Sequence, residues 1–194
     1  MFTHLRTHSH YSLLEAIPKI PELVKRAKKL GMESLALTDA GNLYGAIEFY
    51  KECVDEGIKP IIGVDFYVAT RTRHDKEARV DNQRTRLVLL AENEAGYKNL
   101  LKLVTASYLE GFYYKPRIDR ELLERHNEGL IAIAKEEKYY PEIFKDRFYK
   151  EDSLAIYNVH YLDPSDRPAL NTVLSIQEYL SRGGFNEEDD LSFK

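Results

Sequence analysis

Short apolar runs alternate with amphipathic helical segments along this 194-residue chain, and that alternation leaves few folds open to it. Several runs end in polar residues, as a buried parallel strand does where it delivers a loop to the rim of an active site. Five blocks have this form: 2–12, 35–43, 63–67, 85–91 and 157–162. The pattern predicts an α/β fold with a mostly parallel sheet.

Residue periodicity places the individual elements of this fold. Strands are predicted at 2–7, 34–38, 60–68, 86–91, 130–134, 147–150 and 154–159. Helices are predicted at 21–30, 44–55, 94–108, 121–125, 138–145 and 165–180. Gly57 is expected to end the second helix, and Asn93 to cap the third.

The segments between these elements suggest one domain. Residues 70–85 are strongly charged, which is typical of a solvated loop. The tail at 185–194 is acidic and is expected to be loosely held. No linker divides the chain, so we predict a single domain over residues 1–194.

The composition excludes several classes of protein. The net charge of −4 and the pI of about 5.9 argue against coating nucleic acid by bulk charge, although a local contact stays open. The single cysteine, Cys53, cannot form an internal disulfide, which fits a reducing cytosol. No apolar run is long enough to cross a bilayer, and the N-terminus has no secretion signal. We therefore expect a cytoplasmic protein without membrane contact.

Longer strings inside these blocks are more specific than the alternation itself. They are His8–Leu14, Leu35–Asp39, Gly41–Ala46, Lys59–Gly63, Gly96–Leu100 and Leu109–Arg117. Together they resemble the PHP (polymerase and histidinol phosphatase) domain at the N-terminus of bacterial DNA polymerase III alpha subunits. The resemblance covers most of the chain and distinguishes it from stand-alone PHP phosphatases.

The resemblance implies a distorted (β/α)7 barrel whose strand ends line a cleft for up to three metal ions. It also implies two deletions, because the family is longer after the strand at 130–134 and before the strand at 154–159. The first missing segment carries a cysteine ligand that has no counterpart here. The palm, fingers and thumb of the polymerase are absent, so we expect a fragment that cannot polymerise DNA alone, although a trimmed or engineered barrel stays open.

The ligand pattern of the family is only partly present in this chain. The retained positions are His8, Asp39, Asp65 (a glutamate in the family) and His160. At four other ligand positions the family's histidines or aspartate are replaced by Arg6, Ala40, Arg86 and Asn158. A multinuclear phosphoesterase needs several histidines and carboxylates that converge on its metals, so we expect weak metal binding or none, and no cofactor.

Arginine is not a metal ligand and stays charged at any accessible pH. We therefore expect Arg6 and Arg86 to occupy the former metal site and to pair with Asp39 and Asp65 as a carboxylate clamp. The alternative is a reduced site in which the four retained residues hold one Zn²⁺ or Mn²⁺ and an arginine clamps phosphate. Simpler roles also stay open, such as hydrogen bonding by His8 or helix capping by Asp39.

A second feature is the aromatic and basic stretch at 108–117. Aromatic rings interleaved with lysine and arginine can stack bases and hold phosphates. The simpler interpretation is that Phe112 and Tyr113 pack this loop onto the barrel.

Two functions therefore compete. The first is a catalytically inactive PHP domain of a replicative polymerase. It would serve as a structural module that packs on the remainder of the polymerase polypeptide, docks the proofreading exonuclease subunit and meets DNA only indirectly. The second is a metal-dependent phosphoesterase or 3′–5′ exonuclease that works with the reduced ligand set.

Overall fold

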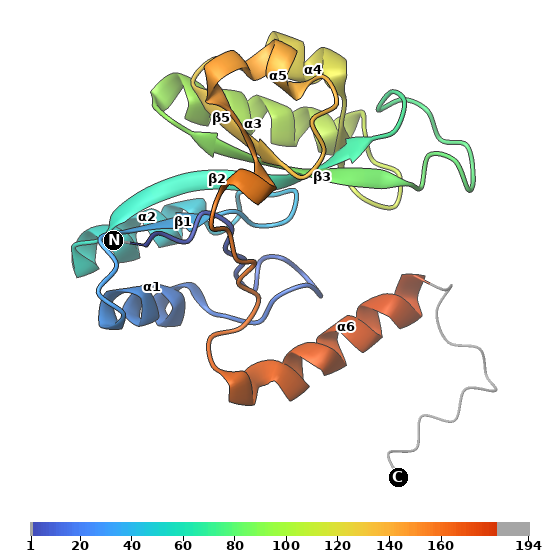
Figure 1. Cartoon of the computed structure of the whole chain (residues 1–194). Helices are drawn as coiled ribbons and strands as arrows, with labels where there is room; N and C mark the ends of the chain where they lie inside the picture. The colour runs from blue at the N-terminus through green and yellow to red at the C-terminus, as the bar shows by residue number, and fades with distance from the viewer. Residues whose placement is uncertain (1, 182–194) are drawn as a thin grey trace, which may run out of the picture.

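The computed structural model describes residues 2–181, which form a six-stranded sheet with helices on both sides (Figure 1). The strands are β1 (Ser34–Leu37), β2 (Lys59–Ala69), β3 (Arg84–Ala91), β5 (Leu130–Ala134) and β6 (Phe148–Lys150), in the spatial order β1-β2-β3-β5-β6. The short β4 (Arg117–Ile118) pairs with the end of β2. The fold is therefore mixed α/β, as the alternation predicted.

The prediction of a mostly parallel sheet is wrong for β3. This strand runs antiparallel to both of its neighbours, β2 and β5, whereas β1, β4 and β6 each pair in parallel. Parallel neighbours need a crossover connection, usually a helix. The connection from β2 to β3 contains no helix, so β3 returns alongside β2 in the opposite direction.

The charged connection between β2 and β3 is mostly exposed, as the sequence predicted, but Arg73 and Asp81 within it are buried. Arg117 is fully buried and donates hydrogen bonds to the carbonyl oxygens of Arg73, Asp75 and Asp81 at 2.9–3.0 Å. The buried Asp81 carboxylate in turn accepts hydrogen bonds from Arg71. A buried guanidinium must satisfy its donors, and here it does so by fixing the loop backbone.

The helices lie close to their predicted positions. They are α1 (Ile20–Lys29), α2 (Ala46–Glu56), α3 (Glu94–Leu109), α4 (Arg120–Arg125), α5 (Tyr140–Phe144) and α6 (Arg167–Ser181). Gly57 ends α2 with a φ of 72°, a conformation that glycine adopts without steric cost. The Asn93 side chain caps α3 by accepting a hydrogen bond from the Gly96 amide at 3.1 Å.

The two strands predicted at 2–7 and 154–159 do not form. Within residues 2–181, the only backbone bridge between these segments joins Thr7 and Val159, and the ring of Tyr157 contacts those of Phe2 and His4. The chain leaves β6 through a 3-10 turn at Glu151–Ser153, and this connection is too short for a crossover to another parallel strand. Leu5 and Leu154 still pack against the sheet, so both segments cover its inner face without extending it.

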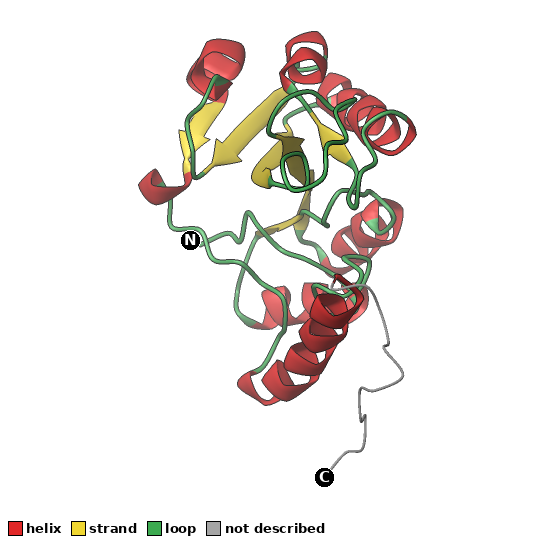
Figure 2. Cartoon of the chain, turned by 90° about the vertical axis from the view of Figure 1, so that its right-hand side faces the viewer, coloured by secondary structure: helices red, strands yellow, loops and turns green. Residues whose placement is uncertain are grey.

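Strand alternation divides the sheet into two faces. On β2 and β3, the side chains of Val64, Phe66 and Leu87 join the core beneath α3, α4 and α5. Figure 2 shows the sheet with these helices along one side. Neighbouring residues in a strand point to opposite faces, so Asp65 and Arg86 point away from that core. These side chains meet the N-terminal segment on the other face.

Two further points complete the description of the fold. None of the helices in the described part of the chain is long and apolar enough to cross a bilayer. The predicted loose tail at 185–194 lies outside the described residues.

Candidate functional site

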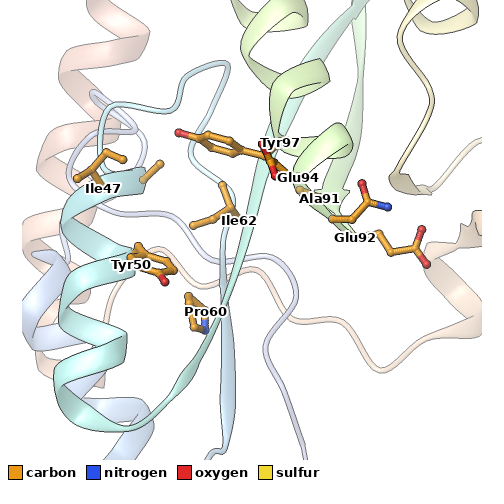
Figure 3. Close-up of a pocket in the computed structure, with 10 residues that line it drawn as sticks. Ile47, Tyr50, Pro60, Ile62, Ala91, Glu92, Glu94 and Tyr97 are labelled. Atoms are coloured by element: carbon orange, nitrogen blue, oxygen red, sulfur yellow. The ribbon is translucent and has the colours of Figure 1, made fainter.

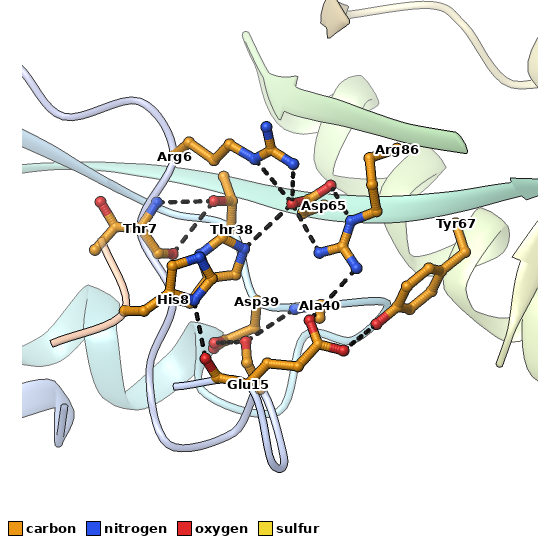
Figure 4. Close-up of polar contacts among 12 residues, drawn as sticks. Arg6, Thr7, His8, Glu15, Thr38, Asp39, Ala40, Asp65, Tyr67 and Arg86 are labelled. Atoms are coloured by element: carbon orange, nitrogen blue, oxygen red, sulfur yellow. Dashed lines mark hydrogen bonds and ion pairs between the residues drawn. The ribbon is translucent and has the colours of Figure 1, made fainter. Parts of the chain in front are cut away.

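Asp65 is the centre of a dense network of ion pairs (Figure 4). Its carboxylate is fully buried and receives a bidentate pair from Arg86, with Nε 2.9 Å from Oδ1 and Nη2 2.8 Å from Oδ2. Arg6 approaches from the N-terminal segment and places Nε and Nη2 each 2.9 Å from Oδ2. One carboxylate is thus held between two guanidinium groups, with Glu151 as a second acceptor for Arg6 at 3.2 Å.

The network keeps Asp65 ionised. Burial alone would raise its pKa, but a hydrogen bond from His8 and the charges of Arg86 and Arg6 outweigh this and hold the pKa well below its usual range. Burial lowers the pKa of Arg86, but the charge of Asp65 and its hydrogen bonds outweigh this and raise the pKa above its ordinary value. Because both partners stay charged, the ion pair persists at every ordinary pH.

His8 and His160 stack face to face beside this carboxylate. Their ring centroids lie 4.4 Å apart with an interplanar angle of 5°. His8 Nε2 lies 3.2 Å from Asp65 Oδ2, and His160 Nδ1 lies 2.9 Å from the carbonyl oxygen of Glu15. Burial, followed by the proximity of His8, lowers the pKa of His160 to about 4, so its ring is neutral at pH 7.

Asp39 does not join the arginine network, so the prediction that the arginines also pair with it is wrong. Its buried carboxylate accepts hydrogen bonds from the Ser9 amide at 2.7 Å, the Ser9 hydroxyl at 2.8 Å and the Ser12 hydroxyl at 2.6 Å. These nearer donors hold the carboxylate against the turn at Ser9–Ser12. The two serines, spaced three residues apart, were the signal that could have indicated this role.

Glu15 is a second carboxylate of the site that sequence reasoning missed. It pairs with Lys115 at 3.0 Å and with Arg86 at 3.4 Å, and it accepts a hydrogen bond from the Tyr67 hydroxyl. Burial raises its pKa, but Arg86, Tyr67 and Lys115 together bring the pKa below its ordinary value. Glu15 lies in a loop without periodic structure, so no sequence pattern marked it.

Comparison with known proteins identifies the family of this chain. A model described as the PHP domain matches residues 4–157, which is most of the chain. The chain belongs to the PHP domain family. DNA polymerase III subunit alpha of Borreliella burgdorferi is 54% identical over 134 residues, covering 69% of this chain and 12% of that protein. The Aquifex aeolicus subunit is 36% identical over 249 residues, covering 99% of this chain and 21% of that protein.

This PHP domain thus spans only about a fifth, or less, of the length of these curated relatives. The Aquifex alignment extends over 249 residues, more than the 194 of this chain, so the longer protein has positions that lack a counterpart here. A crystal structure from Bifidobacterium adolescentis, described as a candidate metal-dependent phosphoesterase, superposes with a TM-score of 0.50 over 91% of this chain and 84% of that one. At 9% identity this likeness shows the fold alone.

The described side chains of this PHP domain, at residues 2–181, do not fit a metal cluster. Within residues 2–181, no group of three histidine, cysteine or carboxylate side chains is placed to hold an ion. Both oxygens of Asp65 face guanidinium groups, and both oxygens of Asp39 accept hydrogen bonds from the Ser9–Ser12 turn. Ala40 forms a backbone bridge to Asp65 and donates its amide hydrogen to the Ser12 hydroxyl oxygen, and Asn158 is exposed outside the network.

Proposed function

We propose that this chain is the N-terminal PHP domain of a DNA polymerase III alpha subunit and that it serves DNA replication as a catalytically inactive module in the cytoplasm. The similarity to alpha subunits from Borreliella and Aquifex supports the replication role. The observation that carries the inactivity is the double guanidinium pair on Asp65. We further propose that the parent PHP barrel is shortened here, in line with the extra aligned positions of the Aquifex protein.

Electrostatics explains why the arginines would exclude a metal. Two fixed positive charges already neutralise the buried Asp65, and a divalent cation in the same place would be repelled by both. Moving the arginines away would leave buried charges unpaired, which costs several kcal/mol. We therefore propose that no metal cofactor is bound and that the ion pairs fulfil the structural part of the metal's role.

We propose the remainder of the polymerase polypeptide as the main partner, with the proofreading exonuclease subunit as a second partner and DNA as an indirect one. An apolar groove of about 330 Å³ between α2 and the start of α3 supports the first of these (Figure 3). Ile47 and Tyr50 on its wall are more than half exposed, and Tyr97 faces them. Exposed apolar side chains gathered in this way are typical of a protein contact.

The test is a calorimetric titration of the chelator-treated protein with Mn²⁺ and Zn²⁺. We expect no binding at micromolar metal. A variant with the family's ligands restored (Arg6→His, Ala40→His, Arg86→His and Asn158→Asp) is the positive control and is expected to bind. Stoichiometric binding by the natural chain, abolished by His8→Ala, would contradict the proposal and favour the reduced-site phosphoesterase.

A further inference from the structure

A basic groove lies beside the arginine clamp and is not used by the proposed function. It consists of two adjoining cavities of about 390 and 460 Å³, which share Arg84, Lys115 and Gln177 as lining residues. The first cavity reaches inward to Glu15 and His160, beneath Leu170 and Leu174 of α6. The second reaches outward to Leu14, Asn82 and Tyr114. A small ligand commonly occupies a cavity of this size.

The groove carries a positive charge that the described residues do not neutralise. Arg84, Arg86 and Lys115 surround the Tyr67 ring, with their charged groups 5.5, 4.2 and 5.3 Å from its centroid. Arg86 and Lys115 both pair with Glu15. Within residues 2–181, Arg84 has no carboxylate at ion-pair distance, and its guanidinium donates a hydrogen bond to the Asn82 carbonyl at 2.8 Å. This charge lines both cavities and is available to an anion.

The outer cavity is also lined by two residues in a strained backbone conformation. Leu14 and Tyr114 have φ values of 61° and 60°, in the left-handed region that disfavours residues with a Cβ atom. Tyr114 is 66% exposed, so core packing does not explain why a large aromatic residue stands there. Strain of this kind often marks a functional position. The Tyr114 ring lines the same cavity as Arg84 and Lys115, and an exposed ring in a cavity with two cations suits a nucleobase attached to a phosphate.

We propose that this groove binds a nucleotide, with the phosphate held by Arg84 and Lys115 and the base stacked on Tyr114. The ligand is either a free nucleoside monophosphate or the end nucleotide of a single strand, since both present the same phosphate and base. Binding requires neither a metal nor a reaction at Asp65. The groove thereby gives a function to the aromatic and basic stretch at 108–117.

The test is a calorimetric titration of the full chain with AMP, with inorganic phosphate and with a 5′-phosphorylated pentathymidylate. We expect Arg84→Ala to weaken binding of all three at least tenfold, because a charge-assisted hydrogen bond is lost. Lys51→Ala, which removes an exposed cation on α2, is the matched control and is expected to bind normally. Thermal unfolding of each variant checks that it is folded.

Tyr114→Gly separates base recognition from phosphate recognition. It removes the ring and relieves the strained φ, so we expect a folded protein that binds inorganic phosphate normally but AMP several-fold more weakly. Tighter binding of AMP than of the oligonucleotide would identify a free nucleotide as the ligand, and the reverse order a strand end. The proposal is overturned if Arg84→Ala binds AMP normally, or if Tyr114→Gly leaves AMP binding unchanged. It is also overturned if an acidic peptide of residues 185–190 binds more tightly than any nucleotide.

Discussion

Asp65 and Asp39 are both buried carboxylates at metal-ligand positions of the PHP family, yet the chain satisfies them in different ways. Asp65 is neutralised by the charges of Arg6 and Arg86, whereas Asp39 is satisfied by hydroxyl and amide donors of Ser9 and Ser12. The stability of the Asp65 network therefore depends on charge, whereas the hydrogen bonds of Asp39 depend on the conformation of the Ser9–Ser12 turn. The loss of a metal cluster therefore has at least two structural solutions within one site.

Asp65→Asn is expected to have the largest effect. It leaves the half-buried guanidinium groups of Arg6 and Arg86 without their shared carboxylate, and breaking such a pair typically costs about 3–5 kcal/mol. Glu15 and Glu151 keep one contact each, so we expect the lower end of this range. Urea unfolding at pH 7 measures the free energy. A loss below about 1 kcal/mol would mean that the clamp is not an important source of stability.

Asp39→Asn tests the other carboxylate and should cost less, about 1–3 kcal/mol, because no charged partner is left unpaired. With its oxygen in the Oδ1 position, asparagine keeps the two hydrogen bonds from the Ser9 amide and the Ser12 hydroxyl, while its amide faces the Ser9 hydroxyl. The same unfolding experiment measures the change. If Asp39→Asn proved more damaging than Asp65→Asn, the contrast between charged and neutral partners would be wrong.

The sequence predicted one of these two environments better than the other. Arg6 and Arg86 stand at family ligand positions, so their approach to Asp65 followed from the resemblance. The partners of Asp39 depend on how the Ser9–Ser12 turn folds, and apart from the spacing of the two serines, turn geometry leaves no periodic trace in a sequence. For the same reason Glu15, which lies in a loop, could not be recognised as the second counter-ion of Arg86.

The fold likewise has features that the sequence predicted and features that it did not. Helices were predicted to within a few residues where a clear signal marked them, such as the apolar period of α1 or the asparagine cap of α3. The antiparallel direction of β3 was not predicted, because it depends on the connection at 70–83, whose backbone is bound by the buried Arg117 of β4. The predicted strand at 154–159 failed because a strand needs a neighbour as well as a suitable composition.

A change of pH tests whether His160, next to the charged Asp65 network, contributes to the free energy of unfolding. The pKa of His160 is lowered to about 4, so the folded protein binds fewer protons there than the unfolded chain. This contribution to stability is fully present above the unfolded pKa of about 6.5 and is lost as pH falls toward 4. We expect His160→Gln to flatten the decline in unfolding free energy between pH 7 and pH 5. An unchanged slope would assign that decline to other groups.

Ser12→Ala is the smallest of these changes and isolates one neutral donor. It removes the 2.6 Å hydrogen bond to Asp39 and the acceptor for the Ala40 amide, while both bonds from Ser9 remain. A single hydrogen bond to a charged group contributes about 1.5–3 kcal/mol at most, and the remaining donors should reduce the loss to about 1 kcal/mol. Ser153→Ala, at an exposed position on the 3-10 turn, is the matched control and should change little. Raising the salt from 0.1 to 1 M shortens the screening length from about 10 to about 3 Å. Because the substitution removes no charge, the loss of unfolding free energy should not change over this range. A strong salt dependence would instead place Asp39 within the ion-pair network.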